Sequence, residues 1–419
     1  MITTKKIDCV VIGAGAAGLA ASEIIAAEGV SVALIDREEQ TGGILLQCIH
    51  NGFGLHYFKK ELTGPEYAED FSERVRKLPV DLFLETTVVD IVPQDGHSKV
   101  VTCSARHGVT LFETTTVVLA MGCRERNRGN IGIAGTRPSG IFTAGLAQRL
   151  LNIEGYIPGR RAVIVGSGDI GLIMARRLRW TGSEVAAVVE ILPHPSGLTR
   201  NIVQCLQDFS IPLLLSHAVT RIYGKERVEG VEIAPLDNGV PIVRQARRVD
   251  CDTVLLSVGL IPENELSRKA GVALSPNTNG PIVDHRLQTN VPGIFACGNV
   301  LHVHDLADFV TAEAQRCGGH VVDFLLDRDT APPVTVPVEA GANMKYVTPN
   351  RCAVNRNQHF FMRSLVIREK GELVVSQGSR EVRSRKLSYV RPAEMISTDL
   401  DAETTGLLKD GVPLTFSLR

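Results

Sequence analysis

The residues best suited to chemistry are glycines in a short turn between an apolar run and an Ala-rich segment. The turn reads Gly-Ala-Gly-Ala-Ala-Gly from Gly13 to Gly18, and Asp36 follows 18 residues after Gly18. Glycines let a backbone approach a pyrophosphate closely, and N–H groups at the start of the next helix bind its negative charge. An acid at the end of the following strand accepts ribose hydroxyls. The spacing predicts a dinucleotide site.

A second turn of the same kind begins 153 residues after the first. It reads Gly-Ser-Gly-Asp-Ile-Gly from Gly166 to Gly171, and Glu190 follows 19 residues after Gly171. One glycine turn is weak evidence, because such turns also have purely structural uses. Two complete units in one chain are much stronger evidence, since a repeated unit indicates a repeated fold. We therefore predict two dinucleotide folds.

Each turn requires a strand before it and a helix after it. The apolar runs 9–12 and 161–165 predict buried parallel strands, and 19–28 and 172–180 predict the helices. Further strands are expected at 30–35, 81–84, 87–91, 98–104, 109–115, 116–122, 184–189 and 251–258, and further helices at 67–77 and 306–326. The segments 359–368, 372–376, 381–387 and 395–400 alternate like antiparallel strands. The fold class is therefore α/β, with two Rossmann-like domains that contain parallel sheets and a small C-terminal β module.

Composition narrows the function classes. The 45 Lys and Arg residues balance 46 Asp and Glu residues, so a nucleic-acid partner or an anionic membrane surface is not expected. No apolar run approaches the roughly 20 residues of a transmembrane helix, and no signal peptide is evident. The nine cysteines are scattered without a CxxC pair, which predicts reduced thiols in a cytoplasmic protein.

With both units in view, residues 7–330 resemble the two-dinucleotide-binding flavoproteins, which include the pyridine nucleotide-disulfide oxidoreductases. Four motifs carry the resemblance: the two glycine units with their acids, the strand ending Leu119-Ala120-Met121-Gly122, and the stretch from Pro292 to Asn299. In the family the strand motif usually ends in Ala-Thr-Gly, and the last motif usually ends in Gly-Asp. Asn299 departs from that pattern but keeps an acceptor oxygen, so FAD binding is still expected.

The resemblance implies that the first unit binds FAD and the second binds NAD(H). The implied domains are a discontinuous FAD domain (1–124 and 284–330), an inserted NAD domain (140–283) and a C-terminal β module (338–419), with 124–139 as the joint between folds. The implied FAD-binding residues are Gly13, Gly15, Ala16, Ala17, Gly18, Asp36, Arg37, Gly43, Val89, Ala120, Met121, Gly122, Gly298, Asn299, Asp305 and Leu306. The implied NAD-binding residues are Gly166, Gly168, Asp169, Ile170, Gly171, Glu190 and Gly259.

Two further expectations concern these sites. Asp305 is expected to cap a helix that begins near Leu306 and directs its positive end at the flavin. Glu190 would repel a 2′-phosphate, which favours NADH over NADPH. Arg200 lies ten residues farther on and could bind such a phosphate only if the intervening loop brought it back to the site.

A narrower likeness is to bacterial FAD/NAD oxidoreductases that accompany an anaerobic-type glycerol-3-phosphate dehydrogenase. The α subunits of opine or hydroxyproline dehydrogenases and of sarcosine oxidase are related chains. Residues 42–54, 135–150 and 298–305 carry this likeness. It implies an electron-transfer subunit that exchanges hydride between NAD(H) and FAD beside a partner dehydrogenase. Formation of a homo-oligomer is a further possibility. The C-terminal module is expected to form an interface.

Two other functions compete. Cys48 could make the chain a stand-alone NADH oxidase or peroxidase that cycles through a sulfenic acid, with His50 lowering the pKa of the thiol. Alternatively, the chain is a non-catalytic assembly subunit that keeps FAD as a structural element. His302, His304 and Asp305 have metal-ligand character, but without a further ligand cluster we expect a polar loop and a helix cap, and no metal.

Overall fold

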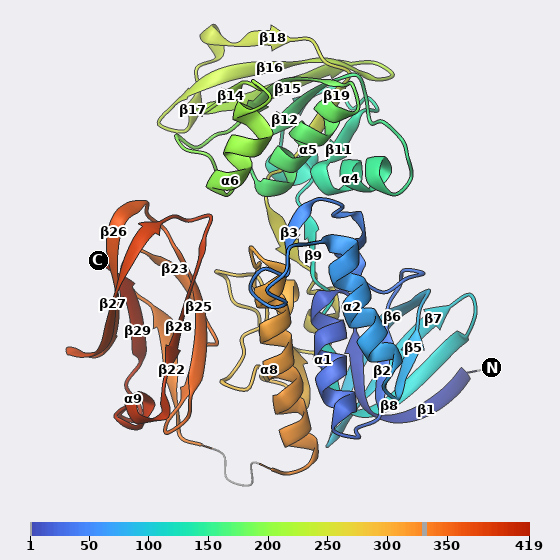
Figure 1. Ribbon diagram of the computed structural model, residues 1–419, viewed down its shortest axis with the longest axis vertical. Coiled ribbons are helices and arrows are strands. Elements are labelled where there is room, and N and C mark those ends of the chain that lie inside the picture. Colours follow the sequence, from blue (N-terminus) through green and yellow to red (C-terminus); the bar gives the residue numbers. More distant parts are fainter. Residues whose placement is uncertain (1, 329–332) are drawn as a thin grey trace. The chain divides into compact units, whose positions relative to one another are not determined.

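The computed structural model describes residues 2–328 and 333–419, and the chain folds as two compact units (Figure 1). The first unit comprises the residues up to Cys123 and those from Pro262 onward, and the second is Arg124–Ile261. The second unit is bounded differently from the expected 140–283. The glycine- and arginine-rich segment 124–139 folds with it, and 262–283 folds with the first unit.

A mainly parallel sheet forms the centre of the first unit. Its strand order is β5-β2-β1-β8-β7-β6, with β21 also paired to β8. Strands β5, β2, β1, β8 and β21 are parallel neighbours, and β7 pairs antiparallel with β6 and β8. The strands are β1 (Ile2–Ile12), β2 (Val32–Ile35), β5 (Val80–Phe83), β6 (Thr86–Gln94), β7 (His97–Ser104), β8 (Gly108–Leu119) and β21 (Ile294–Ala296). Near-continuous apolar runs such as Val32–Ile35 are buried throughout, as a covered parallel sheet requires.

One long strand replaces two expected ones. The sequence predicts separate strands at 109–115 and 116–122, but Gly108–Leu119 is a single strand, β8. Strand β1 begins at Ile2 rather than at residue 9, and its pairing with β8 runs from Ile2–Val109 to Ile12–Leu119. Thr114 and Thr116, where the two expected strands meet, direct their hydroxyls at the carbonyl of Asp8.

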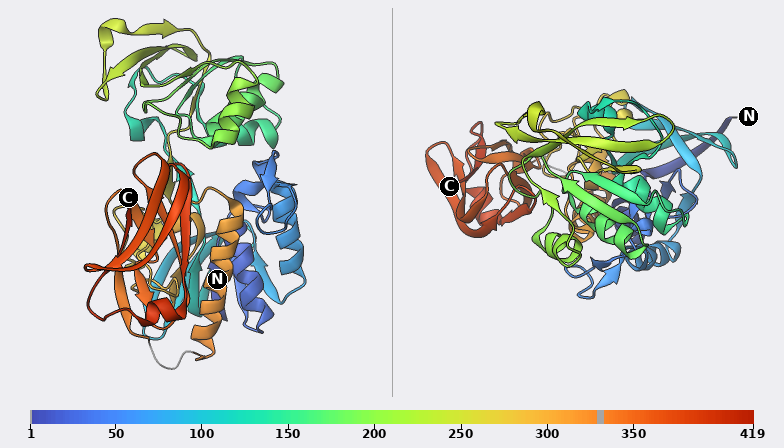
Figure 2. Two further views of the ribbon diagram at one scale, coloured as in Figure 1. Left: turned by 60° about the vertical axis from the view of Figure 1, so that its left-hand side comes forward. Right: turned by 90° about the horizontal axis from the view of Figure 1, so that it is seen from above.

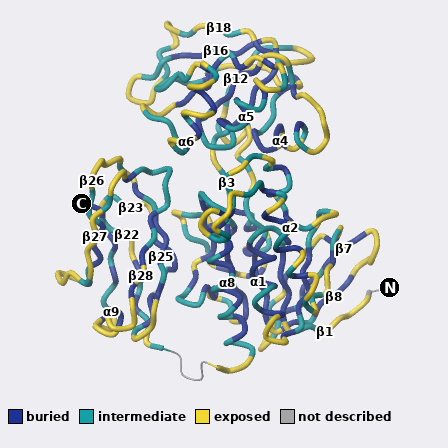
Figure 3. Tube along the Cα trace, in the orientation of Figure 1, coloured by how far each residue is buried: buried dark blue, intermediate teal, exposed yellow. Residues whose placement is uncertain are grey.

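Three helices pack together in the first unit: α1 (Ala16–Ala27), α2 (Gly64–Arg76) and α8 (Ala307–Leu325) (Figures 1 and 3). Small residues allow α1 and α8 to approach closely, since a Cβ on Gly318 would lie 2.9 Å from the carbonyl oxygen of Ala21. A buried hydrogen bond of 2.7 Å joins Tyr67 of α2 to Thr311 of α8. The shorter elements are η1 (Gly43–Gln47), β3 (Asn51–Phe53), β4 (Leu62–Thr63), α7 (Glu265–Lys269) and η4 (Gly298–Val300).

The second unit repeats the parallel design. One sheet has the order β11-β19-β12-β13-β14, and the glycine turn leads from β12 into α5. A second sheet, β10-β15-β16-β17 with β18 on β16, was not predicted, because its strands mix charged residues and prolines with short apolar stretches.

The strands are β10 (Ala134–Gly135), β11 (Ile141–Thr143), β12 (Arg161–Val165), β13 (Glu184–Val189), β14 (Leu213–Leu214), β15 (His217–Gly224), β16 (Val228–Asp237), β17 (Val240–Pro241), β18 (Arg247–Val249) and β19 (Thr253–Leu256). The helices are α3 (Arg128–Ile131), α4 (Ala144–Asn152), α5 (Asp169–Trp180) and α6 (Thr199–Ile202), with short helical turns η2 (Val203–Gln207) and η3 (Val243–Gln245). Strands β9 (Cys123–Glu125) and β20 (Leu260–Pro262) lie where the chain crosses between the units.

The C-terminal residues form a β module with its own core, coloured red in Figure 2. One sheet has the order β24-β22-β29-β26-β27 and the other β23-β25-β28. The elements are β22 (Thr335–Ala340), β23 (Met344–Thr348), β24 (Arg351–Ala353), β25 (Gln358–Ser364), β26 (Arg368–Gln377), β27 (Arg380–Val390), β28 (Met395–Leu400), α9 (Ala402–Gly406) and β29 (Leu414–Leu418). The four predicted strands correspond to β25–β28. Strand β22 was missed because it contains Pro337, and β23, β24 and β29 were missed because each is short. No helix in the described ranges is long and apolar enough to cross a membrane.

The module core generates a first prediction. Phe416 is fully buried and lies 4.8 Å, centroid to centroid, from the ring of Phe360. Phe416→Ala should lower the free energy of unfolding by about 3–5 kcal/mol, because it removes buried apolar contacts and leaves a cavity. Urea denaturation measures the change. The control Leu365→Ala, at a side chain that is 59% exposed, should change stability by no more than about 0.5 kcal/mol, and equal losses in both variants would contradict the assigned core.

Candidate functional site

The first glycine turn forms an open cradle at the start of α1. A Cβ on Gly13 would lie 2.5 Å from the carbonyl oxygen of Ala120, and one on Gly18 would lie 1.7 Å from that of Gly13. Both positions therefore require glycine for close packing. A Cβ on Gly15 would meet no atom within 4 Å, so this face of the turn is open. The first turn of α1, from Ala16 and Ala17, has no acid and no side-chain cap, so its N–H groups suit a pyrophosphate.

Asp36 lies beside this cradle at the end of β2. One carboxylate oxygen accepts the Ala14 N–H at 2.6 Å, and the other accepts the Glu38 N–H at 2.9 Å. A carboxylate can accept about four hydrogen bonds, so Asp36 retains capacity for ribose hydroxyls. The residues present fit an adenine dinucleotide. The neighbouring Arg37 has a side chain that is 71% exposed, and its nearest acid is Glu38 at 3.9 Å.

The loop after Asp36 is tied to the start of α8. Gly43, in η1, packs against Gly15 of the cradle. The N–H groups of Gly54 and His56 donate to the carboxylate of Asp308 at 3.1 and 2.9 Å. The predicted cap of α8 was wrong, because the residue at the N-cap position is Leu306 and it makes no side-chain cap. Asp308 in the first turn instead anchors the loop.

The remaining predicted FAD-site positions lie after β8, after β21 and on β6. Met121 and Gly122 follow β8, where Gly122 has a positive φ of 71°. Asn299 accepts the His304 N–H at 3.0 Å and directs its amide nitrogen at the sulfur of Cys123, 3.6 Å away. Val89 lies on β6 with a side chain that is 41% exposed, and its carbonyl accepts a hydrogen bond from Lys269.

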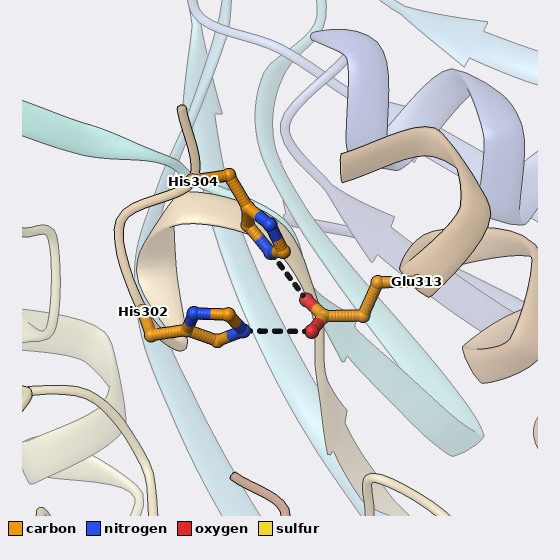
Figure 4. A group of neighbouring side chains, drawn as sticks. All are labelled: His302, His304 and Glu313. Carbon is orange, nitrogen blue, oxygen red and sulfur yellow. Dashed lines mark hydrogen bonds and ion pairs between the residues drawn. The ribbon is translucent and has the colours of Figure 1, made fainter. Parts of the chain in front are cut away.

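A buried carboxylate organises the polypeptide after β21. Glu313, on α8, accepts the Gly298 N–H at 2.7 Å with one oxygen. The same oxygen lies 3.2 Å from Nε2 of His304, and the other lies 2.8 Å from Nε2 of His302 (Figure 4). All three side chains are at most 1% exposed. Each imidazole bonds directly to the carboxylate, so the cluster is a hydrogen-bond network that links the loop to α8.

The charges in this network depend on one another. Burial opposes ionisation of Glu313, but the charges and hydrogen bonds of His302 and His304 outweigh it and hold the pKa of Glu313 well below its usual value. Burial, assisted by His302, lowers the pKa of His304. The Nδ1 atom of His304 is buried and has no hydrogen-bond partner within the described residues. This orphaned atom is a polar group available to a bound cofactor or ligand.

The C-terminal module completes the cluster. Arg363 on β25 forms an ion pair with Asp305, and the Met395 N–H donates to Asp305 at 2.6 Å. The hydroxyl of Tyr346 on β23 lies 3.5 Å from Nδ1 of His302. Burial raises the pKa of Asp305 despite the neighbouring guanidinium. Asp305 therefore pairs with the module and neither caps α8 nor joins the histidines, whose acid is Glu313. Sequence reasoning missed Glu313, Tyr346 and Arg363 because they are distant in the chain.

Cys48 differs from the expectation of an activated thiol. It is partly buried, and its sulfur directs a hydrogen bond at the carbonyl of Ile44 at 3.3 Å. Burial raises the pKa of the Cys48 thiol to about 12. The expectation that His50 lowers this pKa is wrong, because burial dominates and shifts it the other way. A thiol with a raised pKa is a poor nucleophile near neutral pH.

The second glycine turn is more enclosed than the first. A Cβ on Gly166 would lie 2.1 Å from the carbonyl oxygen of Ser257, and the Gly171 N–H donates to the Ser257 hydroxyl at 3.1 Å. Gly168 is the N-cap of α5, and Asp169 in its first turn accepts the Leu198 N–H at 2.8 Å. Ile170 packs into the core beneath α5, and Gly259, with a φ of 97°, follows the end of β19.

The Glu190 carboxylate is hydrogen-bonded to other residues of the second unit. It is only 4% exposed, and one oxygen accepts hydrogen bonds from the N–H and hydroxyl of Ser167 and from the hydroxyl of Ser196. The other oxygen accepts the Leu192 N–H at 3.0 Å. These four bonds use the acceptor capacity of a carboxylate. For Glu190 to bind a ribose, the Ser196 hydroxyl would have to release it, so its role in nucleotide choice stays a prediction.

The comparison with known proteins identifies the class of this site. The family model described as "Pyridine nucleotide-disulphide oxidoreductase" matches residues 7–316. The chain belongs to this family. It is accordingly an oxidoreductase that uses FAD and a nicotinamide nucleotide. The predicted class and cofactors are confirmed at this level.

Individual relatives show how far the likeness extends. One of the opine oxidase subunits, from Agrobacterium tumefaciens (strain Ach5), is 27% identical over 333 residues, covering 75% of this chain and 64% of that protein. An NADH oxidase of Methanocaldococcus jannaschii is 27% identical over 319 residues, covering 73% and 64%. The chain spans less than two thirds of the length of these curated relatives. A thioredoxin reductase structure from T. acidophilum matches with a TM-score of 0.63 at 23% identity over 76% of this chain and 98% of that one, which confirms the two-Rossmann fold.

Two glycines of the first turn provide a matched test of the FAD cradle. Gly15→Ala should leave the fold intact, because its methyl group meets no protein atom, but should reduce the FAD that copurifies at least tenfold by occupying the open face. Gly18→Ala should prevent soluble folding, because its methyl group would clash with a carbonyl oxygen. Absorbance and circular dichroism of the purified proteins measure both. Full FAD content in Gly15→Ala would contradict this position for the pyrophosphate.

The buried carboxylate provides a test of stability and its pH dependence. Glu313→Gln should lower the free energy of unfolding by about 3–5 kcal/mol at pH 7, since it breaks a buried charged network. Because the pKa of Glu313 is lower in the folded protein than the usual value of about 4.3, its contribution is present above that value and disappears as the pH falls through the folded pKa.

Denaturation from pH 7 to pH 3 should therefore show a steeper loss of stability in the wild type than in Glu313→Gln. Glu69→Gln is the control, because Glu69 is exposed and pairs only with Arg76 at the surface. It should stay close to the wild type across this pH range, because an ion pair exposed to solvent contributes little to stability. Parallel curves for the wild type and Glu313→Gln would exclude the proposed charge state of the network.

Proposed function

We propose that this chain is the electron-transfer subunit of a two-component dehydrogenase, with FAD bound to the first unit and NAD(H) to the second. The observation that carries the proposal is the cradle at α1, which combines an open Gly15, an uncapped helix start and an acid with spare acceptor capacity. The second glycine turn supports a second nucleotide, because a purely structural flavin subunit has no use for one. Likeness to a protein named as one subunit of an opine oxidase supports a partner.

The bound cofactors supply the redox chemistry, which is exchange of a hydride between nicotinamide and flavin. The protein's own residues bind and orient the cofactors, and they exclude water from the site. The α1 N–H groups and Asp36 would hold the adenine dinucleotide, while the loop anchored by Asp308 would restrict solvent. Asn299 and the Glu313 network position the loop that precedes α8, which keeps that wall of the site rigid.

The electron partner is proposed to be a separate protein that oxidises the organic substrate. Likeness to the opine oxidase subunits supports an amino-acid or opine type of substrate for that partner, and a glycerol-3-phosphate type is the other candidate. The C-terminal module is proposed as part of the docking surface, since it packs on the FAD-type fold through Arg363 and leaves Leu365 and Tyr389 exposed. The protein is proposed to act in the cytoplasm.

A stand-alone NADH oxidase is the second candidate, favoured by likeness to the M. jannaschii protein of that name. The environment of Cys48 does not support a thiolate mechanism, because its pKa is raised to about 12. If the candidate is nevertheless right, the purified chain should turn over NADH in air, and Cys48→Ser should abolish that turnover. A rate that is unchanged in Cys48→Ser would exclude the thiol route.

Anaerobic reduction tests the main proposal. NADH added to the FAD-loaded chain should bleach the flavin absorbance near 450 nm, a wavelength typical of oxidised flavins, within seconds, and NADPH should act at least tenfold more slowly because of the Glu190 charge. Turnover in air should be slow unless an artificial acceptor dye replaces the partner. A flavin that neither nucleotide bleaches would overturn the proposal in favour of a non-catalytic role in assembly.

A further inference from the structure

A cavity in the first unit lies outside the glycine cradle. Its volume is about 200 Å³, and it is lined by α8 residues from Glu313 to Asp323, the segment 285–287 and module residues from Thr348 to Phe361. Arg316 lies nine residues after the first residue of α8, which is about 13 Å along the helix axis. The cavity therefore lies beyond the helix start, and of the α8 residues that line it only Glu313 also belongs to the hydrogen-bond network with the histidines.

Arg316 is one of three arginines that line this cavity, with Arg286 and Arg356. Its guanidinium stacks over the ring of Phe361, 5.6 Å from the centroid. Across residues 2–328 and 333–419 no hydrogen bond or ion pair reaches it. Burial lowers the pKa of Arg316, although an arginine remains charged in proteins. Glu313 and Asp399 act on Arg316 only through their charges at longer range. A partly buried guanidinium without a directly paired carboxylate is unfavourable, so this position favours an anion from solution.

Two buried donors near Arg316 also have no hydrogen-bond acceptor in the described structure. The Nε atom of Arg286 has none, and its closest acid oxygen belongs to Asp284 at 3.8 Å. The hydroxyl of Thr348, a residue that is 3% exposed, has none either. Leaving buried donors unpaired costs about 1–3 kcal/mol each. Both residues line the cavity, so a bound ligand that accepts hydrogen bonds would satisfy these donors.

The acids around the cavity do not cancel this positive character. Glu313 bonds with both oxygens to the histidines and Gly298, and Asp399 accepts from Nδ1 of His359 at 2.6 Å. Asp323 lies seven residues after Arg316 on α8, about 10 Å along the axis. Its charge is thus at the far end of the lining, and the cavity keeps a positive balance because three arginines (Arg286, Arg316 and Arg356) line it against two acids (Glu313 and Asp323).

We propose that this cavity is a binding site for a small carboxylate anion, which Arg316 holds with its planar guanidinium while Arg286 and Thr348 donate to the same group. The size supports a small acid, because about 200 Å³ is below the usual range for sites of larger ligands. The planar guanidinium fork matches a carboxylate in two parallel hydrogen bonds. The site goes beyond the proposed electron transfer and does not depend on it.

Isothermal titration calorimetry on the full FAD-loaded chain tests the proposal with malonate and acetate as probes. Inorganic phosphate is the comparison anion, and sodium chloride sets equal ionic strength. The wild type should bind at least one of the two carboxylates and should bind it more tightly than phosphate. Arg316→Gln should weaken that binding at least tenfold. Arg179→Gln, at an exposed arginine of α5, should bind like the wild type.

One further variant and one further measurement keep the test decisive. Thr348→Val should weaken carboxylate binding several-fold with little change of shape, and it replaces Arg316→Gln if that variant does not fold. Thermal unfolding in chloride alone should find Arg316→Gln folded with a Tm close to that of the wild type, because the variant loses the stacking on Phe361 but no hydrogen bond or ion pair. Absence of carboxylate binding, equal binding by Arg316→Gln, or tighter binding of phosphate would each overturn the assignment. None of these outcomes bears on reduction by NADH, so the two proposals fail separately.

Discussion

The buried carboxylate of Glu313 is the interaction on which the rest of the first unit depends. One side chain holds the Gly298 N–H and two imidazoles, and so joins the end of β21 to the middle of α8. A charge at 1% exposure is stable only because these donors surround it. The consequence is a loop, from Gly298 to Asp305, that has little freedom to move. That loop contains Asn299 and leads into α8, which are both expected at the flavin.

The C-terminal module is attached to the same loop. Arg363 and the Met395 N–H converge on Asp305, and Tyr346 reaches His302. These contacts make the module part of the wall behind the proposed redox site rather than an independent appendage. They also close one side of the cavity that contains Arg316, whose guanidinium rests on the module residue Phe361. Binding of an anion in that cavity would act directly on residues that adjoin the Glu313 network.

The two glycine turns follow one design but differ in how much of their capacity the protein itself uses. In the first, Gly15 is open and Asp36 keeps acceptor positions. In the second, the Ser257 hydroxyl accepts the Gly171 N–H. The Glu190 carboxylate already accepts hydrogen bonds from Ser167, Leu192 and Ser196. A nucleotide entering the second turn must compete with these internal hydrogen bonds, which predicts weaker and more readily reversible binding than at the first. Such a difference suits a tightly held cofactor and an exchangeable one.

The sequence by itself determined both dinucleotide units, their order and the module strands β25–β28. These features depend on local patterns: glycine spacing, apolar runs and strand alternation all act within about 30 residues. Only the tertiary structure decided that Glu313, and not Asp305, joins the two histidines, and that Asp305 pairs with Arg363 instead of capping α8. It also decided that the Cys48 thiol is not activated and that Arg316 has no hydrogen bond or ion pair within the described residues. Contacts between residues tens of positions apart, and the burial that shifts a pKa, depend on packing that local spacing does not encode.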